Sequence, residues 1–381
     1  MAFNIKGETD ASFAAVEEAF SRNFEDQGEV GAALCIYRGD RPVVDLWGGF
    51  KNATKTEPWQ RDTMVCVYSV SKGVTATCVH MLVDRGLLDL DTPVAEYWPE
   101  FAQNGKETVT PRHILSHTAG IPAFEQPMSV EEYLDWDVAV TRLAEQAPRW
   151  EPGSCLGYQP GTFGHLAGEL IRRVSGKSPG EFLGSEVVQP LGGDFHFGIS
   201  QEHDHRIAEL VPAPPEELAN WGAADPDSMV GKALGNPDVG TPSVSNSTGW
   251  RRAELPGANG HGDARTVARI YAALANGGTL DGIQLLSSDS LDQAIEEQVA
   301  GIDCVMQLEG RMALGYALSG GFFRTTSSPR AFGYPGLGGH MAFADPDAQL
   351  GFAYVANQMR IPADFVDPRV GRILDAVDKC L

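Results

Sequence analysis

The 381-residue sequence predicts an α+β protein in which segments from both ends of the chain form one sheet. Strand-like runs occur before residue 50 and after residue 310, whereas residues 70–190 carry mainly helical spacing. If the terminal strands pair, the helical middle is an insertion, and a cleft forms between the two parts. We therefore expect a sheet domain of residues 1–66 and 263–381, and a helical domain of residues 67–262.

Two patterns predict the start of the sheet domain. Residues 11–26 place Phe13, Val16 and Phe20 on one stripe at helical spacing, which is typical of an amphipathic helix. The β-rich runs VGAALCIY and PVVDLWGG then flank Arg38-Gly39-Asp40-Arg41. Such a Gly-Asp turn between two strand-like runs predicts a hairpin.

The helical domain is predicted from segments with helical spacing, which are residues 71–86, 111–117, 129–146 and 163–175. Pro111 suits the first turn of its helix, where a proline costs no hydrogen bond. Glycine and proline then crowd residues 212–262, so we expect a long irregular excursion. Loops of this length tend to line sites or to act as lids.

The remaining elements return the chain to the sheet. Asp263 is a plausible N-cap for a helix over residues 263–276. The runs RMALGYAL, GHMAFAD and LGFAYVAN are strand-like, and a last helix is expected over residues 367–379.

Composition and charge exclude several classes of function. Hydrophobic residues make up 43% of the chain, which is enough for a large core. With 29 basic and 51 acidic residues, the net charge is -22, and its field repels phosphate backbones and anionic lipids. The N-terminus MAFNIKGETDASF has no signal-peptide pattern, and no run of eighteen apolar residues occurs. We expect a soluble, cytoplasmic protein with neither nucleic acid nor membrane as a partner.

The six cysteines are widely scattered and form no C-x-x-C pair: Cys35, Cys66, Cys78, Cys155, Cys304 and Cys380. Such scatter is more typical of reduced thiols in a core than of a disulfide framework or a zinc site. We therefore expect no disulfide, no metal and no cofactor.

Ser69 and Lys72 lie three residues apart in the stretch YSVSKG, so they share one face if a helix begins near Ser69. The following segment is apolar on most faces, which predicts a buried helix. Burial disfavours the ammonium form, and a lysine of lowered pKa can accept a hydroxyl proton. The helix N-terminus also favours negative charge beside Ser69. These features predict an activated nucleophile, although S-x-x-K is a common pattern and Lys72 could instead extend to solvent.

Two further stretches contain polar groups that could take part in the same reaction. Tyr158 follows the turn Trp150-Glu151-Pro152-Gly153 and precedes a helix, so its phenol could be held rigidly and relay protons. The glycine-rich run of residues 334–340 (YPGLGGH) leads into a strand, and its free N–H groups could face an oxyanion. A half-buried loop tyrosine and an ordinary glycine-rich turn are the alternatives.

These motifs, together with SHTAG at residues 116–120, occur in the order seen in the serine β-lactamase and penicillin-binding superfamily. The chain resembles its esterase branch, the family VIII-type carboxylesterases, which is similar to class C β-lactamases. The resemblance implies an antiparallel sheet flanked by helices, with an inserted helical domain and the site between them. It also implies that Ser69 is the nucleophile, Lys72 the general base and Tyr158 a proton-relaying phenol. The backbone N–H groups of Ser69 and Leu337 would form the oxyanion hole. The substrate would contact Tyr334, Gly336, Gly338 and His340.

Two departures from the penicillin-recognising members bear on the substrate. Pro160 stands where they have an asparagine, and Tyr334-Pro335-Gly336 stands where they have Lys-Thr-Gly. A site without that lysine should favour neutral esters, because a substrate carboxylate would be desolvated without a partner. We expect a serine hydrolase that cleaves small carboxylic esters through a Ser69 acyl-enzyme. The alternatives are weak β-lactam hydrolysis, acyl transfer by the same residues, and a non-catalytic ligand-binding member of the fold.

Other signals are weaker. Residues 176–180 (GKSPG) match the G-x-S-x-G nucleophile elbow, but they follow a helix and read as a capping box around Ser178. His113 and His117 share helical spacing without the glutamate of H-E-x-x-H, and residues 203–205 (HDH) have no supporting histidine cluster. His261 could contact substrate or be structural. The apolar pocket wall could draw on Trp221, Trp250 and Phe124.

Overall fold

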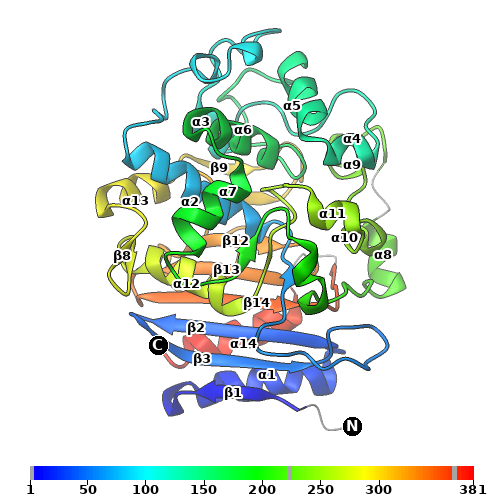
Figure 1. Cartoon of the computed structure of the whole chain (residues 1–381), viewed down its shortest axis with the longest axis vertical. Coiled ribbons are helices and arrows are strands. Elements are labelled where there is room, and N and C mark those ends of the chain that lie inside the picture. The colour runs from blue at the N-terminus through cyan, green and yellow to red at the C-terminus, as the bar shows by residue number, and fades with distance from the viewer. Residues whose placement is uncertain (1–3, 222–224, 363–366) are drawn as a thin grey trace.

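The computed structural model describes residues 4–221, 225–362 and 367–381. Within these ranges, the centre of the molecule is a nine-stranded antiparallel sheet with the order β1-β3-β2-β14-β13-β12-β11-β10-β9 (Figure 1). Its strands come from both ends of the chain, and helices flank it. The predicted fold class is confirmed.

The N-terminal strands form the expected hairpin. β2 (Gly31–Arg38) and β3 (Arg41–Gly49) pair antiparallel, and Arg38 lies opposite Arg41 across the turn. Gly39 has a φ of 58°, a left-handed conformation that glycine adopts without strain. The edge strand β1 (Lys6–Thr9) was not predicted, because its four residues are mostly exposed and carry no apolar alternation.

The C-terminal half of the sheet consists of β9 (Val299–Ile302), β10 (Glu309–Met312), β11 (Ala317–Leu318), β12 (Phe332–Gly336), β13 (His340–Asp345) and β14 (Leu350–Ala356). The run RMALGYAL, expected as one strand, is broken between β10 and β11 by a turn at Gly315, whose φ is 85°. The start of the glycine-rich run, expected as a turn, belongs to β12 despite Pro335.

Helices cover both faces of the sheet. α12 (Ala264–Ala275) packs on one face, and Asp263 caps it by accepting the N–H of Thr266 at 2.9 Å, as predicted. α1 (Ala14–Asp26) and α14 (Pro368–Asp378) pack on the other face. The apolar stripes of α1 and α14 are buried against this face. The stripe of α1 was predicted from its helical spacing.

The inserted helices lie in the upper half of Figure 1, whereas β1 lies at the bottom. They are α2 (Val70–Asp84), α3 (Pro111–Leu115), α4 (Val130–Leu134), α5 (Trp136–Glu145), α6 (Phe163–Ser175) and α7 (Pro179–Leu183). The single helix expected over residues 129–146 is split at Asp135. The carboxylate of Asp135 accepts the N–H of Val138 at 3.1 Å and so starts a new helix.

The excursion expected to be irregular at residues 212–262 contains four short helices among its described residues, and that prediction is wrong in this respect. It holds α8 (Pro215–Trp221), α9 (Met229–Gly235), α10 (Pro242–Ser245) and α11 (Thr248–Arg252). Prolines and serines start these helices at first-turn and N-cap positions, so the residues that suggested loops are helix signals here. The excursion ends in β6 (His261–Gly262), which pairs with β4 (Val65–Cys66) and β5 (Phe195–His196).

The smaller elements are the hairpin strands β7 (Thr279–Leu280) and β8 (Ile283–Gln284), helix α13 (Ser288–Ile295), the 3₁₀ helices at Ala11–Phe13, Val94–Glu96, Pro99–Phe101 and Gln201–Arg206, and a π-helical turn at Gly184–Val188.

Cys155 and Cys304 form a disulfide, with their Cα atoms 6.7 Å apart. The expectation that all six cysteines are reduced is therefore wrong. The two residues are 149 positions apart in the sequence, and only the fold brings them together. The other four cysteines are free thiols.

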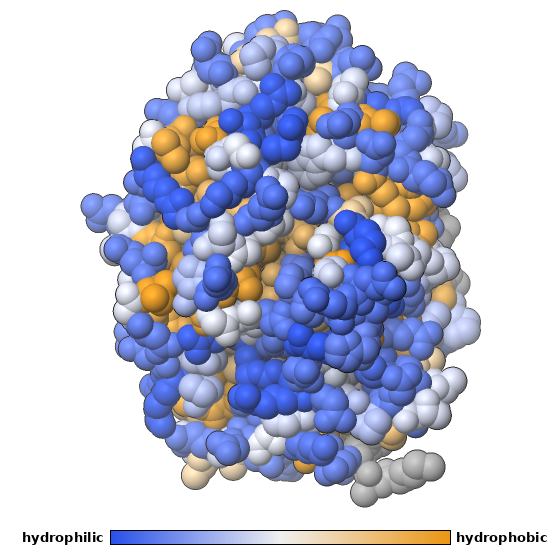
Figure 2. All heavy atoms as spheres, in the orientation of Figure 1, coloured by the Kyte–Doolittle hydropathy of each residue, from blue (hydrophilic) through white to orange (hydrophobic). Residues whose placement is uncertain are grey.

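Figure 2 shows one face on which polar residues predominate and apolar atoms occur in scattered groups. Among the described residues, no helix is long and apolar enough to cross a membrane.

The contact between α12 and β14 provides a test of the packing. A Cβ added at Gly351 of β14 would lie 2.3 Å from the backbone N of Ala272 in α12. Gly351→Ala should therefore lower the free energy of unfolding by about 3 kcal/mol, because the helix must move off the sheet. Gly184 is the matched control, since it has helical backbone angles (φ -58°, ψ -50°) and no atom within 4 Å of an added Cβ. Gly184→Ala should raise stability by about 0.5 kcal/mol in the same urea titration. Equal midpoints for the two variants would contradict this packing.

Candidate active site

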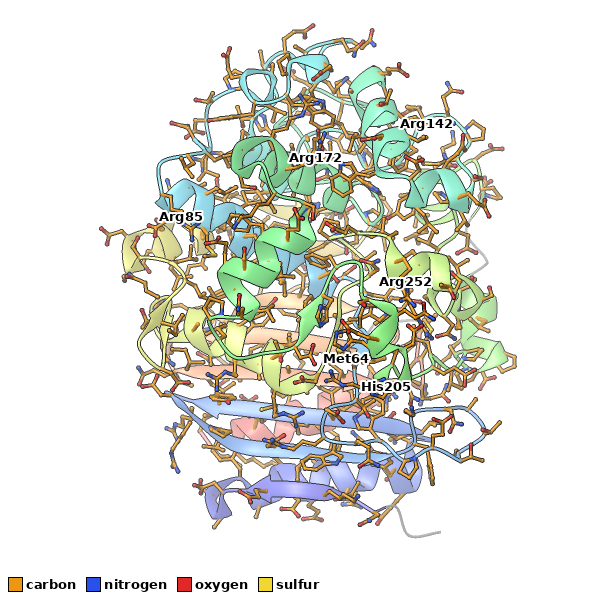
Figure 3. The ribbon with its side chains drawn as sticks, viewed as in Figure 1. Met64, Arg85, Arg142, Arg172, His205 and Arg252 are labelled. Atoms are coloured by element: carbon orange, nitrogen blue, oxygen red, sulfur yellow. A yellow bond between two sulfur atoms is a disulfide. The ribbon has the colours of Figure 1, made fainter. Side chains whose placement is uncertain are left out.

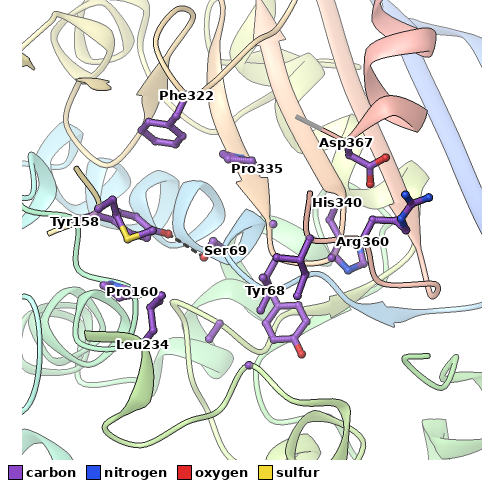
Figure 4. A pocket seen from close by; sticks show the side chains of 18 of the residues that line it. Tyr68, Ser69, Tyr158, Pro160, Leu234, Phe322, Pro335, His340, Arg360 and Asp367 are labelled. Carbon is purple, nitrogen blue, oxygen red and sulfur yellow. Dashed lines mark hydrogen bonds between the residues drawn. The ribbon is translucent and has the colours of Figure 1, made fainter. Parts of the chain in front are cut away.

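Ser69 lies at the N-terminus of α2, on the wall of an apolar pocket (Figure 4). The preceding residue, Tyr68, has a φ of 45°, which is a strained conformation for a bulky side chain. Its ring is buried near Trp250 and His340, and its hydroxyl donates to Ser245 Oγ at 2.8 Å. These contacts hold the strained turn that presents Ser69 to the pocket.

Lys72 lies one turn further along α2 and is fully buried. Its Nζ is 3.0 Å from Ser69 Oγ, 2.8 Å from the Gly257 carbonyl and 3.1 Å from the Pro160 carbonyl. Burial lowers the pKa of Lys72 to about 7. A neutral amine has two N–H bonds and one lone pair. The two carbonyls can take both N–H bonds, which leaves the lone pair directed at the Ser69 hydroxyl.

The Gly257 carbonyl reaches Lys72 because two glycines pack backbone to backbone. A Cβ on Gly257 would lie 2.8 Å from the N of Gly164 in α6, and a Cβ on Gly164 would lie 2.3 Å from the N of Gly257. Gly257 belongs to the 212–262 excursion, for which the sequence offered no motif. Sequence reasoning missed it because a backbone acceptor has no characteristic side chain.

Tyr158 lies on the loop before α6, and its hydroxyl donates to Ser69 Oγ at 2.9 Å (Figure 4). Burial raises the pKa of Tyr158, so the side chain is a phenol and a proton donor at neutral pH. Lys72 Nζ lies 5.2 Å from the centre of its ring. Besides a proton relay, the family resemblance implies that Tyr158 holds Lys72. In the structure the phenol binds the serine, and backbone carbonyls hold the lysine.

The glycine-rich turn between β12 and β13 brings Leu337 to the pocket. Within the described part of the chain, neither the N–H of Ser69 nor that of Leu337 donates a hydrogen bond to another protein group. Gly338 and Gly339 have φ values of 91° and 101°, which the turn requires. Behind the turn, the buried guanidinium of Arg369 donates to the Gly338 carbonyl at 3.0 Å and fixes its position.

Most of the pocket wall is apolar. Among the residues that form it are Leu234, Val239, Met306, Leu308, Phe322 and Leu337. Gly336, Gly338 and His340, expected to contact substrate, also line the pocket. His340 is 1% exposed, and neither of its ring nitrogens has a hydrogen-bond partner among the described residues. Burial lowers the pKa of His340 to about 3, so the ring is neutral.

Tyr334 does not line the pocket, so the expectation that its side chain contacts substrate is wrong. It is fully buried, and its hydroxyl lies 2.6 Å from Nε2 of His117, the histidine of SHTAG. On the other side of the ring, His117 Nδ1 lies 3.0 Å from Gln159 Oε1 and 3.2 Å from the backbone N of Gln159, so His117 joins Tyr334 to Gln159. The pair supports the residues around Tyr158 from behind. The penicillin-recognising members have a lysine in the place of Tyr334, so the comparison suggested a side chain that faces the substrate. The alternation of side chains along a strand would have indicated one that faces the core.

The weaker sequence signals have structural roles. His113 Nδ1 accepts the N–H of Thr110 in the capping box of α3, and Ser178 caps α7. His261 Nδ1 lies 2.7 Å from the Asn259 carbonyl and is buried away from the pocket. His205 is exposed in the 3₁₀ helix Gln201–Arg206 (Figure 3), and its Nδ1 lies 2.8 Å from the Glu202 carbonyl, while the neighbouring Asp204 pairs with Arg252 at 2.5 Å. No cluster of possible metal ligands occurs among the described residues.

Of the three aromatic residues considered for the pocket wall, two are buried elsewhere. Trp250 lies behind Tyr68, and Phe124 packs against Tyr133 and His165. The side chain of Trp221 falls outside the described residues.

The arrangement of a serine, a buried lysine and a tyrosine is accompanied by a match to a family model. The model described as Beta-lactamase matches residues 14–376. The chain belongs to the beta-lactamase family. It is 33% identical, over 95% of its length and 85% of the relative, to the Esterase/beta-lactamase LipL of Mycobacterium tuberculosis (strain ATCC 25618 / H37Rv).

Two solved structures are similar over nearly the whole chain. One is a family VIII carboxylesterase, with a TM-score of 0.92, 39% identity and coverage of 99% of this chain and 100% of the other. The second is a penicillin-binding protein homolog from Caulobacter crescentus, with a TM-score of 0.90, 36% identity and the same coverage. The predicted resemblance is confirmed, and family membership supports a hydrolase.

The lowered pKa of Lys72 predicts the pH dependence of catalysis. The base is neutral above its pKa, so kcat/KM for a neutral ester should rise tenfold per pH unit below about 7 and become constant above it. Initial rates between pH 5 and 9 would test this. Burial lowers the pKa of His117 to about 3, so that histidine does not titrate in this range. His113→Gln, which changes a half-buried histidine outside the pocket, should keep the same inflection. A rate that falls as pH rises through 7 would show that Lys72 acts as an ammonium.

Proposed function

We propose that the protein is a serine hydrolase that cleaves small, neutral carboxylic esters through an acyl-enzyme on Ser69. The observation that carries this proposal is the placement of Ser69 Oγ between a buried amine and the phenol of a half-buried tyrosine. Lys72 Nζ is 3.0 Å away and Tyr158 OH is 2.9 Å away. A hydroxyl that can lose its proton to one neighbour, while the other holds a proton, is suited to acyl transfer.

In acylation, Lys72 takes the Ser69 proton as Oγ attacks the ester carbonyl. The oxyanion forms beside the free N–H groups of Ser69 and Leu337, and each such donor typically lowers the barrier by about 3 kcal/mol. Tyr158 donates its proton to the leaving alkoxide, and the Lys72 ammonium then returns a proton to the Tyr158 phenolate, so that the proton taken from Ser69 is balanced by the one that leaves with the alcohol. Collapse of the tetrahedral intermediate releases the alcohol and leaves the acyl group on Ser69.

In deacylation, a water molecule replaces the alcohol. Lys72, neutral again, removes a proton from this water as it attacks the acyl carbonyl. The same two N–H groups stabilise the second oxyanion, and the proton returns to Ser69 as the acid leaves. No residue beyond those of acylation is needed.

The charges around the pocket support neutral substrates. Arg360 and Arg324 both line it, but Arg360 pairs with Glu217 at 2.7 Å and Arg324 pairs with Asp375. A substrate carboxylate would therefore have to compete with existing ion pairs. The Pro160 carbonyl, which stands in place of the asparagine amide of penicillin-recognising relatives, is directed at Lys72 instead of the substrate.

The two sides of the pocket suit different parts of an ester. Since Tyr158 protonates the leaving oxygen, the alcohol lies on its side, where Phe322 contributes apolar wall (Figure 4). The acyl group then lies toward Gly336, Gly338 and His340. The neutral, unpartnered ring of His340 is available to donate a hydrogen bond to an acyl substituent.

The comparisons support the same class of activity, because a relative carries an esterase name and a similar solved structure is a carboxylesterase. We also propose that residues 1–66 with 263–381 and residues 67–262 act as two domains with the site between them. Ser69 and Tyr158 then come from one domain and Leu337 comes from the other. Weak β-lactam hydrolysis is a second candidate, favoured by the shared Ser69, Lys72 and Tyr158.

Covalent labelling tests the nucleophile directly. A fluorophosphonate should add one phosphonyl group, and the modified peptide should contain Ser69. Ser69→Ala should lose the label and reduce kcat for p-nitrophenyl butyrate by at least about 10⁴-fold. Ser243→Ala, an exposed serine of the excursion, should keep both label and rate. A label on any other serine would contradict the assignment, and binding without a covalent adduct would favour the non-catalytic alternative.

The absence of an unpaired cation among the described pocket residues predicts a preference between substrate classes. A cephalosporin bearing its carboxylate should be hydrolysed with a kcat/KM at least about 100-fold below that of a neutral butyrate ester. Steady-state kinetics on the same enzyme preparation measures both values. Comparable values would favour β-lactam hydrolysis as the main activity.

A further inference from the structure

The chain around Tyr158 is fastened to a second segment, residues 303–308, which we name the 303–308 loop. The N–H of Tyr158 donates to Asp303 Oδ2 at 2.7 Å, and the N–H of Cys304 donates to the Leu156 carbonyl at 2.8 Å. The disulfide between Cys155 and Cys304 joins the same two segments covalently. Three connections therefore link the Tyr158 segment to a loop that follows β9.

Asp303 is the centre of these connections. It is 3% exposed, lines the pocket and has no lysine or arginine partner within the described residues. Its Oδ1 accepts the N–H groups of Val305 at 2.7 Å and Met306 at 2.8 Å, so one carboxylate shapes its own loop and holds Tyr158. A buried carboxylate is costly, and its three N–H bonds offset that cost.

The residues before and after Tyr158 are bonded to His117 instead of to the 303–308 loop. The N–H of Gly157 donates to the His117 carbonyl at 2.9 Å, and the N–H of Gln159 donates to His117 Nδ1. The N–H of Tyr158 itself donates to the carboxylate of Asp303. The position of the phenol over Ser69 therefore depends on His117 on one side and on Asp303 on the other.

We propose that Asp303 is a positioning residue for the reaction, which aligns the Tyr158 phenol with the leaving oxygen, and that the Cys155–Cys304 disulfide holds Asp303 in place. This inference rests on the proposed role of Tyr158 as the proton donor. It predicts that Asp303 matters for the leaving group and little for substrate binding.

Leaving-group chemistry separates positioning from simple stabilisation. An ethoxide leaves only with a proton from Tyr158, whereas p-nitrophenolate is a stable anion that leaves without one. A displaced phenol should therefore slow ethyl butyrate far more than p-nitrophenyl butyrate. A purely structural loss of folded enzyme would lower both rates by the same factor.

Asp303→Asn is the variant that tests the proposal. Its amide oxygen can still accept the bonds from Val305 and Met306, but its NH₂ group would face the N–H of Tyr158, donor against donor. We expect kcat for ethyl butyrate to fall about 100-fold, kcat for p-nitrophenyl butyrate to fall less than about 3-fold, and both KM values to stay unchanged. Tyr158→Phe should show the same selective loss.

Asp345 provides a matched control. It is 1% exposed, and its Oδ1 accepts the N–H groups of Asp347 and Ala348 at 3.0 and 3.2 Å, the same local turn as at Asp303. It lies at the end of β13 away from His340. Asp345→Asn should therefore leave the ratio of the two rates unchanged, even if it lowers the unfolding midpoint.

The disulfide permits a test on the unaltered chain. Cys304 is exposed, so dithiothreitol can reduce it: two electrons from the dithiol convert the disulfide to two thiols, and the reagent becomes a cyclic disulfide. Reduction, verified by thiol counting, should lower kcat for ethyl butyrate about 10-fold and spare p-nitrophenyl butyrate. The double variant Cys155→Ser with Cys304→Ser should show this loss without reductant and no response to it. Cys380→Ser should respond as the wild-type protein does.

The outcomes distinguish the two levels of the proposal. If the wild-type protein hydrolyses neither ester, the proposed function is wrong and the inference falls with it. If it hydrolyses both, and Asp303→Asn or reduction changes the two rates by the same factor or not at all, the inference alone is wrong. A selective loss on ethyl butyrate in both experiments, absent from Asp345→Asn, supports it.

Discussion

The site depends on one interaction, the contact between a fully buried amine and the hydroxyl of Ser69. Water would hold Lys72 as an ammonium, which cannot accept a proton. Burial removes that hydration and lowers the pKa of Lys72 to about 7. The carbonyls of Gly257 and Pro160 then offset part of the cost of burying a polar group, and they direct the lone pair toward the serine. Reactivity thus follows from where the lysine is enclosed.

The enclosure requires three distant parts of the chain. α2 supplies Ser69 and Lys72, the loop before α6 supplies Tyr158 and Pro160, and the excursion supplies Gly257. Each contact is short, so a shift of about 1 Å in any part would break the arrangement. The backbone contact between Gly164 and Gly257 shows how closely these parts are packed.

The oxyanion side of the site has its own support. The turn that carries Leu337 is held by Arg369, a fully buried guanidinium paired with Glu29 at 2.9 Å and Asp367 at 2.7 Å. Removing one partner from such a buried network typically costs about 3–5 kcal/mol. The chain therefore maintains a costly cluster of charges behind the turn, while the pocket in front of it is largely apolar. The charged groups that line the pocket, among them Arg360 and Asp367, are held in ion pairs, which leaves backbone N–H groups as the donors for the oxyanion.

The sequence by itself determined the α+β class, the sheet from both chain ends, the hairpin at Arg38–Arg41 and the roles suggested for Ser69 and Lys72. Alternation, helical spacing and cap residues are local signals, and S-x-x-K works within one helical turn. Only the tertiary structure shows that the Gly257 carbonyl binds Lys72, that Tyr158 is bonded to Asp303, that Cys155 and Cys304 form a disulfide and that Tyr334 is buried against His117. These contacts join residues far apart in sequence or use backbone atoms. Neither kind leaves a pattern in the order of side chains, because the chain path brings the partners together.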